Sequence, residues 1–331
     1  MASARGQVSS VLREIQTPVR DRLDLVAVEM HDIMTADLPF IQDVIKHLLR
    51  MRGKLFRPTL ALLASATEGS SEPRAVTLAA AIELMHLATL VHDDSVDHSV
   101  LRRGLPTVNS MFSHQVSVIM GDLLYSRSLG TLVRMGDITI LGILTDAADA
   151  LAIGEMRQFG AIDRLGFSES EYFALIRAKT ASLLAAACES GALCGASRHS
   201  AAMKKYGDRL GMAFQIADDI LDYTEDETVT GKPGGLDLKE HKVTLPLIAA
   251  LPRLSAGGRR RIDELFATES PPDRLVSDVI AIVSEAGGID AARQRSEQFM
   301  QEADDALSAI PESPARTSLG DAIGYVMERR S

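Results

Sequence analysis

Two long segments of the sequence carry almost no polar side chains, and they constrain the fold more than any other feature. Within residues 76–91 the polar side chains are Thr77, Glu83, His86 and Thr89, and residues 180–196 are almost entirely Ala, Leu, Gly, Ser and Cys. A helix that is apolar on nearly every face has to be surrounded by other helices. We therefore predict that both segments lie at the centre of a helical bundle, with the more charged helices outside them.

The rest of the chain also has the composition of helices. Gly and Pro punctuate the sequence, the segments between them are rich in strong helix formers, and the alternation typical of strands is nearly absent. We predict an all-α chain with helices at about 7–34, 38–51, 56–67, 74–98, 113–135, 138–160, 169–195, 200–223, 244–251, 273–286, 288–308 and 313–329.

The length of 331 residues fits either one large domain or two smaller ones. Because neither a linker nor a change in composition divides the chain, we expect a single domain over residues 1–331, with loops at 225–242 and around 267–274.

The composition excludes several classes of protein. Hydrophobic residues make up 46% and charged residues 24%, which is typical of a packed globular chain. The formal charge of −10 disfavours binding to nucleic acid. Cys188 and Cys194 match neither a disulfide framework nor a zinc site, and we expect both to be buried. No secretion signal and no long uncharged apolar window is evident, so we expect a cytoplasmic protein without a transmembrane helix.

The motif DDxxD occurs twice, each time at the end of an apolar helix. The two sets are Asp93, Asp94 and Asp97, and Asp218, Asp219 and Asp222. On a helix, the first and last residues of each motif lie one turn apart on the same face. A single motif could be a solvated acidic helix end, but two such clusters of like charge beside apolar walls call for a counter-charge. Mg²⁺ supplies it, sharing its coordination between carboxylates, water and phosphates, so the pair predicts an Mg²⁺-bound polyvalent anion.

Cationic side chains lie close in sequence to the acidic motifs or in short basic motifs of their own. They are Lys54, Arg57, Arg102, Arg103, Lys179, Lys232 and Lys242. Lys54 and Arg57 are three residues apart, which would place them on one helical face. Taken singly, each cation is more often a surface charge, and His86 is as often a core histidine as a ligand contact. Together they suit an anionic ligand.

These residues belong to a longer ordered series of motifs: GKLFRP (53–58), ELMH (83–86), the first DDxxD, LRRGLPT (101–107), GD (121–122), KT (179–180), FQ (214–215), the second DDxxD, GKP (231–233) and DLKEHKVTLPL (237–247). The series resembles that of the trans-polyprenyl diphosphate synthases of the isoprenoid class I type, and the resemblance covers most of the chain.

The resemblance implies an all-α bundle with a central cavity, usually a homodimer, that condenses isopentenyl diphosphate head to tail with an allylic diphosphate. It implies that Asp93, Asp94, Asp97, Asp218 and Asp222, assisted by Asp219, hold about three Mg²⁺ ions on the allylic diphosphate. Contacts to the same diphosphate would come from Arg102, Lys179, Lys232 and Lys242, while Thr180 and Gln215 would direct dipoles towards the reacting carbons. The isopentenyl diphosphate would be bound by Lys54, Arg57, His86 and Arg103. One departure is His241, which stands where relatives often have Gly.

Product length is predicted from the helix that enters the first motif. Ala88 and Thr89, five and four residues before Asp93, are small where short-chain relatives commonly have bulky aromatics, and Met85 could line a channel without sealing it. We therefore expect a product of more than twenty carbons. The alternative is that both residues are small only to let helices approach closely, which leaves a short-chain synthase open.

Two other functions remain as alternatives. A class I terpene cyclase shares the fold and the first acidic motif, but its second metal site normally combines Asn or Asp, Ser or Thr, and Glu. A non-catalytic subunit of a partner synthase would be expected to lack some of the acidic or basic residues, and none is missing here.

Overall fold

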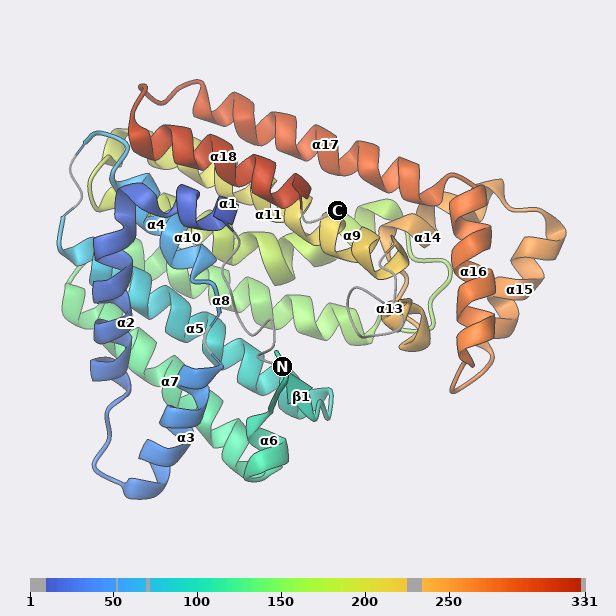
Figure 1. Ribbon diagram of the computed structural model, residues 1–331, viewed down its shortest axis with the longest axis horizontal. Coiled ribbons are helices and arrows are strands. Elements are labelled where there is room, and N and C mark those ends of the chain that lie inside the picture. The colour runs from blue at the N-terminus through green and yellow to red at the C-terminus, as the bar shows by residue number, and fades with distance from the viewer. Residues whose placement is uncertain (1–9, 52, 70–71, 225–233, 329–331) are drawn as a thin grey trace. The chain divides into compact units, whose positions relative to one another are not determined.

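The computed structural model of the chain describes residues 10–51, 53–69, 72–224 and 234–328 (Figure 1). Most of the described residues are helical, so the all-α prediction is confirmed. The chain forms two compact units: unit 1 comprises Met1–Ala148, Ala186–Lys204 and Leu307–Ala322, and unit 2 comprises Asp149–Ala185, Lys205–Ala306 and Ile323–Ser331.

Unit 1 is organised around the apolar helix α5. It contains α1 (Ser10–Ile15), η1 (Thr17–Val19), α2 (Arg20–Met34), α3 (Pro39–Arg50), α4 (Phe56–Ser65), α5 (Arg74–Val96), α6 (Val108–Met111), α7 (His114–Met135) and η3 (Ser197–His199). Helix α5 packs against α7, α4 and α2. Its length and composition would suit a membrane span, the one such case among the described residues, but 72% of its apolar window is buried inside the protein. The prediction of a central helix over residues 76–91 is thus confirmed.

The predicted single helix over 7–34 is wrong, because the described part of this segment divides into α1, η1 and α2. Pro18 lies in the first turn of η1 and has no N–H to donate, so it removes a helical hydrogen bond and disfavours a continuous α-helix here.

A short β-hairpin follows α5. Strands β1 (Leu101–Arg102) and β2 (Leu105–Pro106) pair antiparallel, with Arg102 opposite Leu105. The two turn residues, Arg103 and Gly104, have φ angles of 54° and 74°, as the tight turns of two-residue hairpins require. The sequence analysis did not predict this hairpin, because strands of two residues show no alternation.

Unit 2 has its own core. It contains α9 (Glu169–Ile176), the π-turn η2 (Arg177–Ala181), α13 (Leu236–Lys239), α14 (Leu245–Ala250), η4 (Leu251–Arg253), α15 (Ala256–Phe266) and α16 (Asp273–Glu285). Fully buried side chains such as Met212, Leu247 and Val279 pack together in it. The sequence analysis missed α15, whose first turn contains Gly257 and Gly258, and missed α13 within the predicted loop 225–242.

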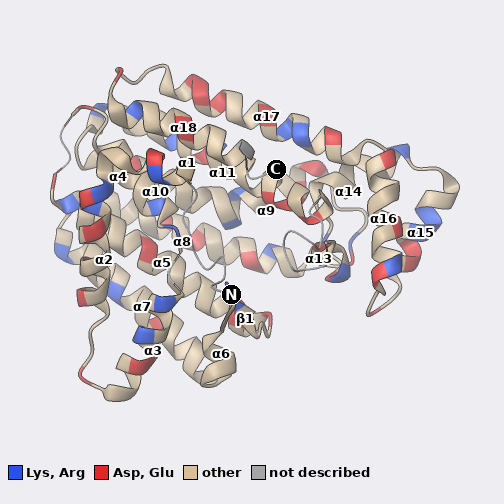
Figure 2. Cartoon of the chain, in the orientation of Figure 1, with Lys and Arg blue, Asp and Glu red and all other residues tan. Residues whose placement is uncertain are grey.

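Five further helices contribute residues to both units. They are α8 (Ile138–Phe159), α10 (Ser182–Leu193), α11 (Ser200–Thr224), α17 (Gly288–Leu307) and α18 (Pro314–Glu328). Helix α10 is buried and contains Cys188, and both cysteines are buried free thiols, as predicted. In contrast, α17 and α15 carry bands of both charges (Figure 2).

Candidate active site

The first acidic motif lies at the C-terminal end of α5 in unit 1. Helix α5 ends at Val96, and the Asp97 N–H donates to the Asp93 carbonyl over 2.8 Å, so the two residues lie one turn apart as predicted. Asp94 faces elsewhere and is only 2% exposed. The motif therefore presents Asp93 and Asp97 together and directs Asp94 into the protein.

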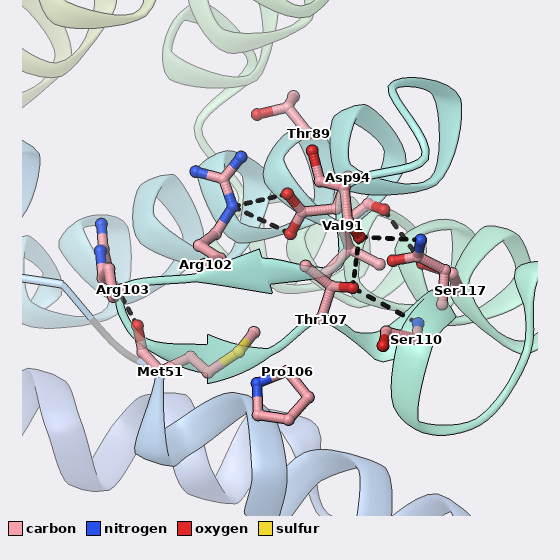
Figure 3. A network of polar contacts seen from close by, with 12 residues as sticks. Met51, Thr89, Val91, Asp94, Arg102, Arg103, Pro106, Thr107, Ser110 and Ser117 are labelled. Atoms are coloured by element: carbon pink, nitrogen blue, oxygen red, sulfur yellow. Dashed lines mark hydrogen bonds and ion pairs between the residues drawn. The ribbon is translucent and has the colours of Figure 1, made fainter. Parts of the chain in front are cut away.

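The hairpin supplies a partner for Asp94. Arg102 Nε donates to both carboxylate oxygens of Asp94, over 2.8 and 2.9 Å (Figure 3). Burial raises the pKa of Asp94, while the hydrogen bond and charge of Arg102 act in the opposite direction. In this structure Arg102 is thus engaged with the acidic motif itself.

Arg103, the next residue, extends to a different place. Its Nη1 donates to the Met51 carbonyl over 2.7 Å (Figure 3). A Cβ added at Gly53 would lie 2.8 Å from the same guanidinium, so glycine at the start of the GKLFRP motif leaves room for Arg103.

Arg103 and Arg57 form a cationic cluster beside His86. Burial lowers the pKa of His86 well below its ordinary value, and the nearby positive charges of Arg57 and Arg103 lower it further. Glu83 is 7% exposed, and burial raises its pKa against the pull of the same two arginines. The structure therefore brings together three of the four residues predicted to bind isopentenyl diphosphate.

Lys54, the fourth residue predicted to bind isopentenyl diphosphate, lies before the start of α4. The prediction that Lys54 and Arg57 share one helical face is wrong, because α4 begins at Phe56 and Leu55 has a left-handed backbone with a φ of 52°. Lys54 is exposed, and its carbonyl accepts a hydrogen bond from Gln16 over 3.0 Å.

The residues predicted to set product length lie on α5. Ala88 and Met85 are buried, with Ala88 1% exposed. Thr89 is half-buried, and its hydroxyl donates to the His86 carbonyl over 2.8 Å. Because it precedes Asp93 by four residues, Thr89 shares the face of the helix that carries Asp93 and Asp97.

The second acidic motif lies near the end of α11 in unit 2, and its middle residue is also held by the protein. Asp219 is 6% exposed and accepts hydrogen bonds from Tyr172 Oη over 2.5 Å and from Gln215 Nε2 over 2.8 Å. Burial, followed by the nearby charge of Asp237, raises its pKa above the ordinary value. Asp222 accepts from the backbone N–H groups of Leu236 and Asp237, each over 3.0 Å.

Thr180 and Gln215 lie in the same hydrogen-bonded chain. Thr180 Oγ1 donates to Gln215 Oε1 over 2.7 Å, and the Gln215 amide in turn donates to Asp219. Lys179, one residue earlier in the π-turn, donates to Glu155 over 2.9 Å and to Gln158 over 2.7 Å. The α8 backbone can approach this turn because Gly154 has no side chain. A Cβ at this position would lie 2.9 Å from the backbone nitrogen of Lys179.

A cavity of about 160 Å³ lies within unit 2 at this network. Its lining residues are Gln158, Ala161, Ile162, Phe167, Tyr172, Leu175, Ile176, Lys179, Thr180, Gln215, Asp219, Asp237, Lys242, Val243 and Thr244. Lys242 pairs with Glu240 over 2.5 Å and with Asp237 over 3.8 Å. Lys232 lies outside the described residues.

Sequence reasoning missed Tyr172 and Asp237, which both line this cavity. Tyr172 could have been found from the sequence, because a tyrosine in an apolar helical segment is expected to be buried, and a buried phenol needs a hydrogen-bond partner.

The donor chemistry of both motifs suits a hard divalent cation. No three His, Cys, Asp or Glu side chains in the described part of the chain form a group that could hold a metal alone. Each motif instead has two carboxylates one turn apart, with its third carboxylate bonded to Arg102 or to Tyr172. Mg²⁺ ordinarily binds one or two carboxylates and completes its coordination with water and substrate phosphates, which this arrangement fits.

An all-α chain with two such motifs and clustered cations is typical of the class of prenyltransferases, and comparisons with known proteins agree. The Polyprenyl synthetase family model matches residues 38–283. The chain is 35% identical over 319 residues to the all-trans-nonaprenyl-diphosphate synthase (geranyl-diphosphate specific) of Rhodobacter capsulatus, covering 96% of this chain and 98% of that protein. It is 36% identical over 290 residues to the short chain isoprenyl diphosphate synthase of Methanothermobacter thermautotrophicus, covering 86% of this chain and 89% of that protein.

A solved structure is similar over nearly the whole chain. The polyprenyl synthase of Caulobacter crescentus, crystallised with calcium and isoprenyl diphosphate, superposes with a TM-score of 0.90 at 31% identity, covering 99% of this chain and all of that one. The chain therefore belongs to the polyprenyl synthetase family. It is a prenyltransferase that carries out the condensation of a prenyl diphosphate synthase, in a family that uses a divalent metal.

Proposed function

We propose that the protein condenses isopentenyl diphosphate with an allylic diphosphate in an Mg²⁺-dependent reaction to give an all-trans polyprenyl diphosphate of more than twenty carbons. The observation that carries this proposal is that each acidic helix end has a cation close to it. Arg102 is bonded to Asp94 in the first motif. In the second motif burial raises the pKa of Asp222, and the nearby charge of Lys242 opposes that rise. A bound divalent metal supplies charge that stabilises the departing diphosphate. We assign the metal-binding carboxylates to Asp93, Asp97, Asp218 and Asp222, with about three ions bound.

The cationic cluster of unit 1 suits the isopentenyl diphosphate. Arg57 and Arg103 provide charge-assisted hydrogen bonds to phosphate oxygens, and Lys54 adds a third cation. Because burial and the two arginines lower the pKa of His86, its ring is neutral and donates a single hydrogen bond. These residues bind and orient the acceptor substrate and carry out no proton transfer of their own.

The network of unit 2 suits the allylic diphosphate. Lys179 and Lys242 line its cavity and would meet the negative charge that develops as the allylic carbon–oxygen bond breaks. The family resemblance assigns Arg102 and Lys232 to the same diphosphate. The Thr180–Gln215–Asp219 chain fixes the orientation of the Gln215 amide, and the Thr180 and Gln215 oxygens can then face the cationic carbons. The new carbon–carbon bond forms when the isopentenyl double bond attacks that cation, and the released diphosphate takes the proton that is lost.

The long product is supported by two observations. Ala88 and Thr89 leave no bulky side chain one turn before Asp93. The relative from Rhodobacter capsulatus is a nonaprenyl diphosphate synthase. The short-chain relative at similar identity favours the alternative, a synthase that stops at fifteen or twenty carbons.

We further propose a cytoplasmic homodimer in which residues 1–331 form one polyprenyl synthetase domain. Exposed apolar side chains on α7 and at the start of α8 support a subunit interface, since Ile119 is 67%, Val133 61% and Ile138 79% exposed.

One incubation tests the proposed function. The purified chain is given Mg²⁺, isopentenyl diphosphate and a fifteen-carbon allylic diphosphate, and the dephosphorylated products are separated by chromatography. We expect a main product longer than twenty carbons. A main product of twenty carbons would favour the short-chain alternative. A parallel incubation with a five-carbon allylic diphosphate separates a synthase that stops at fifteen carbons, which consumes isopentenyl diphosphate only there, from a non-catalytic subunit, which consumes it with neither primer.

A further inference from the structure

The residue before Lys242 has an unusual backbone. His241 has a φ of 54°, in the left-handed region that side chains with a Cβ rarely adopt. Its contact partner Asp163, in the connection between α8 and α9, has a φ of 61°. Two non-glycine residues in this conformation, in contact with each other, indicate that the surrounding interactions hold them there.

Those interactions join three segments of unit 2. The His241 ring contacts the Asp163 carboxylate through Nδ1 and lies 3.1 Å from the Thr268 carbonyl through Nε2. The Asp163 N–H also donates to the His241 carbonyl over 3.2 Å. The ring lies 5.4 Å from the Phe266 ring, tilted by 32°, and the side chain is only 12% exposed.

Two of the joined segments are walls of the cavity. Ala161 and Ile162, immediately before Asp163, line it on one side of the contact. Lys242, Val243 and Thr244 line the cavity on the other side of the contact. The His241–Asp163 pair therefore ties together two stretches of the wall directly behind the lining residues.

We propose that His241 is a positioning residue that holds the two wall segments together and thereby fixes Lys242 towards a diphosphate bound in the cavity. The inference rests on the proposed contact of Lys242 with the allylic diphosphate. Glycine at position 241 would adopt the same backbone without strain, but it would lose both side-chain contacts and keep only the backbone hydrogen bond from Asp163. On this proposal the imidazole holds Lys242 through its two side-chain contacts, and its own atoms do not touch substrate.

The first test replaces His241 and Asp163 with Gly or Asn, because Gly and Asn adopt a left-handed backbone readily. His241→Gly and Asp163→Gly each remove one side of the pair and should raise the KM for the allylic diphosphate about tenfold, with kcat within about twofold of wild type. His241→Asn keeps an N–H donor near Asp163 and should restore most of the affinity. The double glycine variant should be no worse than His241→Gly alone, because His241→Gly already removes the side-chain contact with Asp163. Thr268→Ala is the matched control, since it keeps the carbonyl that Nε2 contacts.

The second test separates the proposal from the function on which it rests. Binding of inorganic diphosphate with Mg²⁺ is measured by calorimetry for Lys242→Ala, His241→Gly and the double variant. We expect both single variants to weaken binding and the double variant to match Lys242→Ala. If Lys242→Ala binds normally, the assignment of Lys242 fails. If Lys242→Ala weakens binding while His241→Gly does not, or if the two losses add, the positioning role of His241 is overturned. Should His241→Gly not fold, Asp163→Gly replaces it in the same comparison.

Discussion

Tyr172 donates its phenolic hydrogen to Asp219 Oδ2 over 2.5 Å, and Gln215 occupies the other oxygen of the same carboxylate. Tyr172→Phe removes one of the two side-chain donors that fix Asp219 and, through it, the Gln215 amide. We expect kcat to fall about tenfold with little change in the KM for isopentenyl diphosphate, as steady-state kinetics would show. Tyr223→Phe is the control, because that buried hydroxyl contacts Thr244 rather than Asp219. Equal losses in both variants would contradict the role given to Tyr172.

The buried Asp219 carboxyl predicts how stability depends on pH. Burial raises its pKa above that of the unfolded chain, so the folded protein binds this proton more tightly. The free energy of unfolding should therefore fall as pH rises above about 4, the ordinary aspartate range, with a slope of at most about 1.4 kcal/mol per pH unit.

Urea unfolding in EDTA at several pH values measures this slope. Asp219→Asn should flatten the curve, and an equally steep curve in that variant would assign the effect to other groups.

Both acidic motifs should be required for turnover. Asp93→Ala and Asp218→Ala each remove a carboxylate from a pair one turn apart, and each should lower kcat at least about a hundredfold, or ~3 kcal/mol of transition-state stabilisation. Asp290→Ala, which removes a surface carboxylate paired with Arg293, should leave the rate unchanged. Activity at the wild-type rate in either motif variant, or in EDTA, would show that the carboxylates do not bind the catalytic metal.

The cationic cluster of unit 1 should act on one substrate only. Lys54→Ala or Arg57→Ala should raise the KM for isopentenyl diphosphate much more than that for the allylic substrate, because each removes a charge-assisted contact to one ligand. Lys46→Ala removes an exposed cation paired with Asp43 and serves as the control. Equal changes in both KM values would place these cations in the other site.

Substitution at Ala88 decides between a product channel and plain packing. If a channel passes Ala88, Ala88→Phe should shift the main product to fifteen or twenty carbons and leave the first condensation largely intact. If the 1% exposed Ala88 only lets helices approach, phenylalanine would instead overpack the core and cost about 1–3 kcal/mol. Thr89→Phe is the companion variant, because the half-buried Thr89 shares the face of Asp93 and has more room. Product chromatography and thermal unfolding of both variants give the answer.

The sequence predicted the long apolar helix well, and it predicted short elements and breaks within helices poorly. The predicted helix over 74–98 is α5, because its apolar run is long enough to exclude other structure. Helix α15 was missed because Gly257 and Gly258 are poor helix residues, and its burial of Ile262 and Leu265 outweighs them. The π-turn within the predicted helix 169–195 leaves no sequence signal, because its residues are ordinary helix formers.

The same contrast holds for the candidate site. The spacing of Asp93 and Asp97 follows from helical geometry alone. The pairing of Asp94 with Arg102 does not, because it depends on a hairpin with two-residue strands. The contact of His241 with Asp163 joins residues 78 apart in sequence, and no local pattern encodes such a distance.

The hairpin between α5 and α6 also limits how this region can evolve. Its left-handed turn sends two adjacent, chemically identical side chains to separate destinations, Arg102 to the acidic motif and Arg103 to the Met51 carbonyl. Point substitutions can alter either arginine independently. A one-residue insertion or deletion would misdirect both guanidinium groups at once, so we expect the length of this connection to tolerate less change than the identity of either residue.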